Sequence, residues 1–295
     1  MFIAFPVLAT LFLSIGLQLN LGAILSDNPG GVLTGEITAE HYDFVLTHTD
    51  TFNLDGFPKW PPLGTLAHNA IWIAIHLPLT MFAGLALALI LRDVKGASVV
   101  KATIFIGMVT PMIVGGIILR FLYTGGVGIV PAFFEAIGVE ALSGSWISRP
   151  ETVLFALVFG SVWLWTGFSL IVYSAGLTTI PKEYFEAAKV DGASSFRVFT
   201  RIVFPLLKPI TLVVVTMTVL WNLKIFDIVF AATNPSGGVG QAADVLAMQM
   251  YRYTFLGFPG SPFELGLARG AAVAALLTLL TLVATAWLVR RLSRR

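Results

Sequence analysis

The chain has 295 residues, of which 57% are hydrophobic and only 12% are charged, and its formal net charge is +2. Soluble domains usually carry about twice that charged fraction, so much of this surface is expected to face lipid. The sequence contains no cysteine, which excludes disulfides, thiolate metal sites and cysteine nucleophiles.

Apolar segments of the chain are long enough to cross a membrane, whose hydrocarbon core of about 30 Å takes roughly 20 helical residues. In chain order they are residues 1–25, 65–91, 99–122, 152–177, 206–232 and 265–289. The first is too long for a simple cleaved signal peptide, so we expect a retained span. The third is the weakest, because Gly107, Pro111, Gly115 and Gly116 interrupt it. The pattern predicts an all-α integral membrane protein with six transmembrane helices in one domain, residues 1–295.

The lysines and arginines predict the orientation, because cytoplasmic loops are enriched in them. They gather between the second and third segments, between the fourth and fifth, and at the C-terminus. The loop of residues 26–64 instead holds six carboxylates and one base, Lys59. We therefore expect both termini in the cytoplasm, an extracytoplasmic loop at 26–64 and a cytoplasmic loop at 181–205.

A short helix is predicted inside the 181–205 loop. Pro181 suits a first helical turn and Glu183 suits its positive end, while Asp191 and Gly192 signal its end. Side chains such as Tyr184, Phe185 and Ala188 would be available for contact. The residues alone leave open a second interpretation, an amphipathic helix lying among lipid headgroups.

The residue order in this loop resembles the signature loop of bacterial ABC-importer permeases. The match is Glu186-Ala187-Ala188, three residues, Gly192, nine residues, then Ile202 and Pro205, with Phe204 where the family usually has Leu. Other matches are Asn69, residues 165–168 (Trp-Thr-Gly-Phe) and residues 175–177 (Ala-Gly-Leu). Residues 224–229 and 250–252 look most like the binding-protein-dependent, maltose/alpha-glucoside-like sugar-uptake branch. The resemblance covers nearly the whole chain.

This resemblance implies that the loop forms a cytoplasmic coupling helix, between the fourth and fifth spans, that docks on a separate ATPase. The coupling residues would be Glu183, Tyr184, Glu186, Ala187, Ala188, Asp191 and Gly192. The implied partners are a second homologous permease, two ATPase subunits and an extracytoplasmic sugar-binding protein, in a bacterial inner membrane. No nucleic acid is expected as a partner. ATP and magnesium would bind the ATPase, and this chain would need no cofactor.

The absence of catalytic motifs from this chain agrees with ATP hydrolysis by a separate subunit. The sequence has no Gly-x-x-x-x-Gly-Lys-Ser/Thr phosphate loop and no metal-binding spacing such as His-Glu-x-x-His. His68 and His76 are expected to be buried and hydrogen-bonded rather than to relay protons. We therefore expect a transport subunit and not an enzyme.

A candidate substrate pathway lies on the expected fifth helix, because ionisable residues inside a span often mark a pathway. Lys224 and Asp227 are three residues apart and would share a helix face. Nearby side chains offer the hydrogen bonds and ring faces that sugars use, which gives the set Trp221, Asn222, Lys224, Phe226 and Asp227. Alternatively, Lys224 and Asp227 would contact only each other or the partner permease. Gln249, Tyr251 and Arg252 are candidates for an outer gate.

The sequence thus predicts a permease that imports an oligosaccharide, for example an alpha-glucoside, by ATP-driven alternating access. Two alternatives remain open: an ABC permease for a non-sugar solute, and an ion-driven secondary transporter. A secondary transporter would have more spans or an inverted repeat. A membrane-embedded enzyme would need a catalytic constellation, and the sequence presents none.

Overall fold

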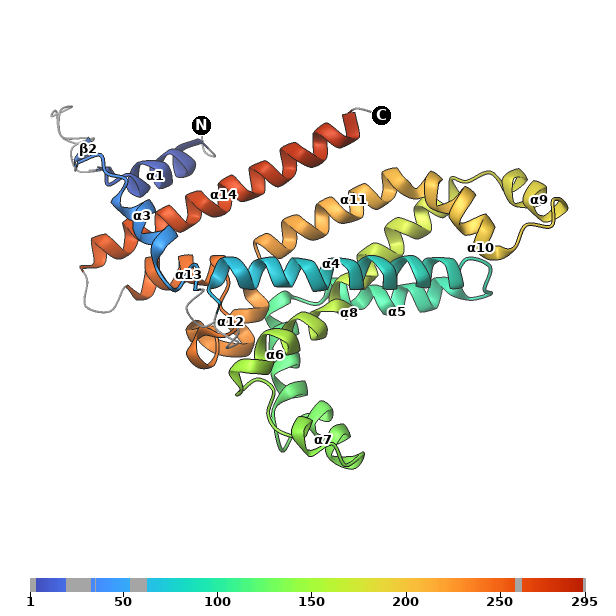
Figure 1. The fold of residues 1–295 in the computed structure, drawn as a ribbon, viewed down its shortest axis with the longest axis horizontal. Coiled ribbons are helices and arrows are strands. Elements are labelled where there is room, and N and C mark those ends of the chain that lie inside the picture. Colours follow the sequence, from blue (N-terminus) through green and yellow to red (C-terminus); the bar gives the residue numbers. More distant parts are fainter. Residues whose placement is uncertain (1–3, 20–32, 35, 54–62, 258–261, 294–295) are drawn as a thin grey trace. The chain divides into compact units, whose positions relative to one another are not determined.

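The computed structural model describes residues 4–19, 33–34, 36–53, 63–257 and 262–293, and most of these residues are helical (Figure 1). The α-helices are α1 (Ala4–Ser14), α3 (Glu40–Thr47), α4 (Thr65–Ile90), α5 (Ala97–Val109), α6 (Met112–Tyr123), α7 (Ile129–Ala136), α8 (Pro150–Thr178), α9 (Lys182–Val190), α10 (Ser195–Val198), α11 (Phe204–Leu223), α12 (Asp227–Thr233), α13 (Leu246–Tyr251) and α14 (Phe263–Ser293). Short 3-10 turns lie at Glu140–Leu142, Asn234–Ser236 and Val239–Gln241, and π-helical turns at Phe199–Val203 and Arg252–Leu256. Strands β1 (Gln18–Leu19) and β2 (Leu33–Thr34) pair antiparallel, with Gln18 opposite Thr34.

Four helical segments in the described part of the chain are long and apolar enough to cross a membrane. They are Thr65–Ile90, Pro150–Thr178, Ser195–Leu223 and Phe263–Arg291. The bent pair α5–α6 would make a fifth if it counts as one span. The all-helical membrane architecture is confirmed at this level, but the predicted count of six spans is not.

The N-terminal segment departs most from the prediction. Helix α1 has 11 residues and ends at Ser14, so it is about half the length of a span. Gly16 then adopts a left-handed φ of 84°, where a side chain would meet the carbonyl oxygen of Glu36 at 2.6 Å. The chain continues into β1, so one helix over residues 1–25 is wrong for the described residues. Residues 20–25 lie outside them.

The third predicted span is broken where its proline stands. Helix α5 ends at Val109, α6 begins at Met112, and the two are bent by 96°. Thr110 adopts an extended ψ of 127°, as expected for a residue whose α conformation is disfavoured by a following proline, here Pro111. The interruption foreseen in the sequence is therefore a sharp bend.

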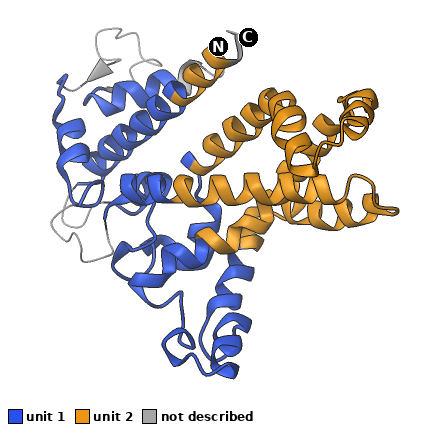
Figure 2. Cartoon of the chain, turned by 45° about the vertical axis from the view of Figure 1, so that its right-hand side comes forward, with its two compact units in different colours: residues 1–71, 116–157, 223–283 blue, residues 72–115, 158–222, 284–295 orange. Residues whose placement is uncertain are grey.

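The chain divides into two compact units, coloured separately in Figure 2. The first comprises Met1–Ile71, Gly116–Leu157 and Leu223–Val283. Its core gathers apolar side chains from α3, α13, the turn after α13, and α14: Val45, Leu246, Ala247, Tyr253, Ala272, Val273 and Leu277. This unit therefore packs α3, from the 26–64 loop, against residues more than 200 positions further along the chain.

The second unit comprises Trp72–Gly115, Val158–Asn222 and Ala284–Arg295. Its helices approach closely at glycines, where there is no room for a side chain. A Cβ at Gly84 would lie 2.8 Å from the backbone nitrogen of Leu170, and a Cβ at Gly167 would lie 2.9 Å from the Cα of Phe105. Small residues permit such contacts between membrane helices. The core is formed by Leu85, Ala88, Leu91, Leu170, Tyr173, Leu177, Ile180, Val203, Leu207 and Val214.

Candidate functional site

The predicted loop helix exists as α9, which lies in the second unit between α8 and α10 (Figure 1). Pro181 is its N-cap, one position before the first helical residue. Glu183 lies in the first turn and Lys189 in the last turn, so both charges suit the helix dipole. The sequence signals for this helix are confirmed.

The C-terminal end of α9 is a Schellman motif centred on Gly192. The backbone N–H of Ala193 donates to the carbonyl of Ala188 at 2.9 Å, and that of Gly192 donates to Lys189 at 3.1 Å. Gly192 has a φ of 65°, which glycine adopts without steric cost. No atom lies within 4 Å of the place where its Cβ would be. The motif therefore needs glycine for its backbone conformation rather than for space.

One face of α9 is turned into the unit. Ala188 is buried and Phe185, one turn earlier, packs on the core of the second unit. The guanidinium of Arg92, from the turn between α4 and α5, lies 3.9 Å from the centroid of the Phe185 ring. The expectation that Phe185 and Ala188 are available for contact is therefore corrected, because these side chains anchor the helix.

The rest of α9 is open. Tyr184 is 52% exposed and Val190 is 88% exposed, and Phe196 of α10 is 76% exposed. The exposed polar and small residues of α9 and its C-terminal end are Lys182, Glu183, Glu186, Ala187, Lys189, Asp191 and Gly192. Apolar side chains that the chain itself leaves uncovered beside three carboxylates form a surface suited to contact with another protein.

The connection from α9 to α11 is helical throughout. Ser194 caps α10 by accepting a hydrogen bond from the N–H of Arg197 at 3.4 Å. The π-helical turn Phe199–Val203 then leads into α11, directly before Pro205. Because Pro205 has no N–H to donate, a widened turn is a natural way to accommodate it.

The predicted fifth helix does not run through the candidate substrate residues. Helix α11 ends at Leu223 and α12 begins at Asp227, so Lys224 lies in the break between them. Among the ion pairs in the described residues, none joins Lys224 to Asp227. The prediction that these two residues share one helix face is therefore wrong, although both side chains are exposed.

The other candidate pathway residues have different surroundings. Trp221 packs edge-on against Phe168, with ring centroids 4.8 Å apart, in the second unit. Asn222 is buried, and its amide Nδ2 lies 3.2 Å from Nδ1 of His76. In the first unit, Phe226 stacks on Phe230 at 5.3 Å and contacts the ring of Tyr251 at 5.3 Å. Asn222 is thus a buried structural contact, while Phe226 belongs to a cluster of aromatic rings.

A buried polar network in the first unit was not predicted as a whole. The hydroxyl of Thr65 donates to Oε1 of Gln249 at 2.6 Å, and Nε2 of Gln249 donates to the hydroxyl of Thr51 at 2.7 Å. The phenol of Tyr253 donates to Asp50 at 3.0 Å. These bonds connect the residues just after α3, the start of α4, α13 and the π-helical turn that follows α13.

An ion pair of Arg252 completes this network. Its Nη2 lies 2.6 Å from Oδ2 of Asp244 and 3.4 Å from Oδ2 of Asp50. Burial raises the pKa of the Asp244 carboxyl to about 6, and the positive charge of Arg252 opposes this shift. Gln249 and Arg252, expected to shape an outer gate, are instead held in a cross-link between distant segments.

His68 belongs to the same network. Its Nδ1 lies 2.8 Å from the carbonyl oxygen of Asp244 and therefore donates, while its Nε2 accepts the N–H of Leu63 at 3.2 Å. One donating and one accepting nitrogen define a neutral imidazole. The prediction that His68 and His76 are buried and hydrogen-bonded is confirmed.

Comparison with known proteins identifies the family. Residues 77–295 match the family described as binding-protein-dependent transport system inner membrane component. A probable ABC transporter permease of Pyrococcus horikoshii is 49% identical over 98% of this chain and 92% of its own length. The alpha-glucoside transport system permease of Rhizobium meliloti is 31% identical over 78% of this chain and 67% of its own.

Solved structures agree on the fold. A chain of a bacterial ABC transporter that imports the acidic polysaccharide alginate aligns with a TM-score of 0.67 and 20% identity, covering 86% of this chain and 84% of that one. The chain therefore belongs to the family of binding-protein-dependent transport system inner membrane components, and it is the permease subunit of an ABC importer rather than an enzyme.

Proposed function

We propose that this permease imports a sugar, and that α9 is the helix through which a separate ATPase drives it. In this proposal both termini and the 181–205 loop lie in the cytoplasm, and a second homologous permease completes the pathway. An extracytoplasmic binding protein delivers the sugar, and two ATPase subunits bind ATP and magnesium. The coupling role is supported by the packing of α9. Phe185 and Ala188 are packed or buried within the second unit, whereas Tyr184 and Val190 are exposed.

The physical argument for coupling is one of rigidity. A helix transmits force to its neighbours only if its own position is fixed. Phe185 ties α9 to the core formed by α4, α8 and α11, while Ala188 is buried on the same side of the helix. Closure of the ATPase dimer would then displace these helices together with α9. The positive-inside distribution of lysine and arginine supports the cytoplasmic placement of the loop.

Docking can be tested with one substitution on the open face. Val190→Asp should abolish co-purification of the ATPase, because a carboxylate would be desolvated in an apolar contact. Val190 is 88% exposed, so the chain should still fold. Val127, 75% exposed in the turn between α6 and α7, provides a matched control, and Val127→Asp should leave co-purification unchanged. Full ATPase recovery with Val190→Asp would contradict docking through this face.

The proposed sugar specificity is supported by the relatives and by residue chemistry. One relative is named as an alpha-glucoside permease and another, from Thermococcus litoralis, as a trehalose/maltose permease with 33% identity. Phe226 and Tyr251 present ring faces within the aromatic cluster, and Lys224 and Asp227 present exposed hydrogen-bonding groups. Aromatic faces and charged hydrogen-bonding groups together are suited to sugar rings and hydroxyls.

The substrate class is tested on the assembled transporter. Uptake of labelled disaccharides into vesicles should depend on ATP and on the binding protein, and Lys224→Ala and Asp227→Asn should lower it while ATPase co-purification stays normal. Unchanged uptake in both variants would remove these residues from the pathway. Uptake by this chain without any ATPase would instead indicate an ion-driven transporter.

A second substrate class is favoured by one relative. An uptake permease for osmoprotective compounds from Synechocystis is 29% identical over 72% of this chain. Competition of labelled disaccharide uptake by non-sugar osmolytes separates the two candidates, because only a permease for such solutes should lose uptake in their presence.

A further inference from the structure

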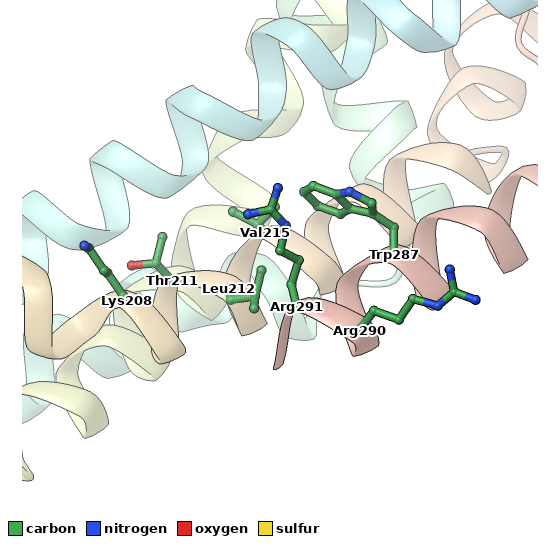
Figure 3. Close-up of a pocket in the computed structure, with 7 residues that line it drawn as sticks. All are labelled: Lys208, Thr211, Leu212, Val215, Trp287, Arg290 and Arg291. Carbon is green, nitrogen blue, oxygen red and sulfur yellow. The ribbon is translucent and has the colours of Figure 1, made fainter. Parts of the chain in front are cut away.

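A groove in the second unit lies between α11 and the last turns of α14 (Figure 3). Its volume is about 830 Å³, within the range of pockets that hold small molecules. Four lining residues come from α11 and three from α14: Lys208, Thr211, Leu212, Val215, Trp287, Arg290 and Arg291. None of these residues has a place in the proposed coupling or substrate sites.

The groove is strongly basic. Lys208, Arg290 and Arg291 all contribute to its lining and all are exposed. Helix α11 contains no acidic residue, and the one acidic residue of α14, Glu264, lies in its first turn, about seven helical turns before Arg290. The two helices that form the groove therefore offer it no nearby carboxylate.

The groove also has an apolar part. Leu212 and Val215 lie between the position of Lys208 and that of Arg291 (Figure 3). The ring of Trp287 is 54% exposed, with the guanidinium of Arg291 5.1 Å from its centroid. Cations beside a half-buried apolar surface match an amphipathic anion, whose charged and hydrocarbon parts would contact the two kinds of side chain.

We propose that this groove binds an anionic phospholipid of the cytoplasmic leaflet, with the phosphate at Lys208 and Arg291 and the acyl chains along Leu212 and Val215. Basic pockets between transmembrane helices on the cytoplasmic side are suited to anionic headgroups. Tryptophan is typical of the membrane interface, which is the depth that Trp287 would occupy. The inference uses the orientation proposed above but not the identity of the transported solute.

Charge complementarity favours lipid over a helix of another subunit as the occupant. A transmembrane helix packed here would enclose Lys208 and Arg291 in a protein contact, at a high desolvation cost. A phosphate supplies the opposite charge while remaining at the water-accessible interface. The lipid would bridge α11, which follows directly from the coupling loop, and the C-terminal turns of α14.

The test uses the assembled transporter, purified in a non-ionic detergent and titrated with phosphatidylglycerol or phosphatidylcholine of matched chains under native mass spectrometry. Each basic side chain near an anionic lipid contributes about a fivefold factor in affinity. Lys208→Gln with Arg291→Gln should therefore weaken phosphatidylglycerol binding by roughly 25-fold. Phosphatidylcholine binding should change little. Val215→Trp, which fills the groove and keeps every charge, should also weaken phosphatidylglycerol binding.

The matched control removes two other cations of the expected cytoplasmic side. Lys95→Gln with Lys101→Gln has the same change in charge outside the groove, and should leave phosphatidylglycerol affinity near that of the original chain. Equal affinity for the two lipids, or equal losses in both double variants, would overturn the proposal. So would cross-linking of the Val215→Cys variant, through its new thiol, to another subunit in the assembled complex. Displacement by inorganic phosphate with no lipid bound would assign the groove to a free anion instead.

Discussion

The guanidinium of Arg92 lies 3.9 Å from the ring centroid of Phe185, so a cation from the α4–α5 turn covers the aromatic anchor of α9. The aliphatic part of such a side chain also shields the ring from water. This contact joins two loops that both carry the basic residues expected of the cytoplasmic side. It provides a second attachment for α9, in addition to the burial of Ala188.

Removing this cation should loosen α9 without removing its docking surface. A cation–π contact contributes about 0.5–1 kcal/mol at an exposed site, so Arg92→Gln should lower uptake several-fold. ATPase co-purification should persist, because Tyr184 and Val190 are unchanged. Uptake in vesicles and pull-down of the ATPase measure the two effects separately. Lys95→Gln, with the same loss of charge in the same turn, should match the original chain, and equal losses in both variants would assign the effect to charge alone.

Substitutions at Gly192 should lower uptake more when the new residue tolerates a left-handed backbone conformation less well. Its φ is 65° and the space around it is open, so steric size should matter less than backbone strain. Asparagine tolerates this conformation, whereas a β-branched residue is strained by about 1–2 kcal/mol. We expect uptake to fall in the order Gly192→Asn, Gly192→Ala, Gly192→Val. Equal uptake in all three variants would contradict the role of the Schellman motif.

The sequence predicted α9 well because its signals are local. Pro181, Glu183 and Gly192 act through the backbone and dipole of the helix itself, and each stands where the structure uses it. Which side chains face inward could not be read from the same residues. That depends on Arg92 and on the core of α4, α8 and α11, which no local pattern specifies.

The other differences between the elements expected from the sequence and those in the structure have similar causes. The break after Leu223 falls within residues 210–233, which contain no proline or glycine, so the sequence predicts a continuous helix there. Breaks at Gly16 and Pro111 have local signals, and the second was noted as a weak point of its span. The network of Thr51, Thr65 and Gln249 joins positions up to 198 residues apart, and hydrophobic periodicity carries no information about such pairings.

Lys224 and Asp227 should act independently, since they flank a helix break and form no ion pair with each other in the described structure. The fold-losses in uptake from Lys224→Ala and Asp227→Asn should therefore multiply in the double variant. For residues without a shared contact, the coupling energy is expected to be below about 0.5 kcal/mol. A double variant no worse than either single variant would indicate a direct pair.

Arg252 should be important for stability in the first unit. Its side chain is 14% exposed and that of Asp244 is 2% exposed, so Arg252→Gln leaves a buried carboxylate without its cation. Breaking a buried pair from one side costs about 3–5 kcal/mol, and a clear fall in melting temperature in detergent is expected. Adding Asp244→Asn should restore much of the loss, because it removes the unpaired charge. A double variant as unstable as Arg252→Gln alone would contradict this explanation.

The Asp244 carboxyl should also make stability depend on pH. Its pKa rises from 3.8 to about 6 in the folded chain, chiefly through burial. Between these values the folded chain holds more protons at this group than the unfolded chain does, so its contribution favours folding at low pH and is lost as the pH rises through 6. Asp244→Asn removes the titration, and its melting temperature should vary less between pH 4 and pH 6 than that of the original chain. Asp43→Asn, at an exposed carboxylate of α3, is the control that should keep the original pH profile. If Asp244→Asn and the original chain have parallel profiles over this interval, another group is responsible for the pH dependence.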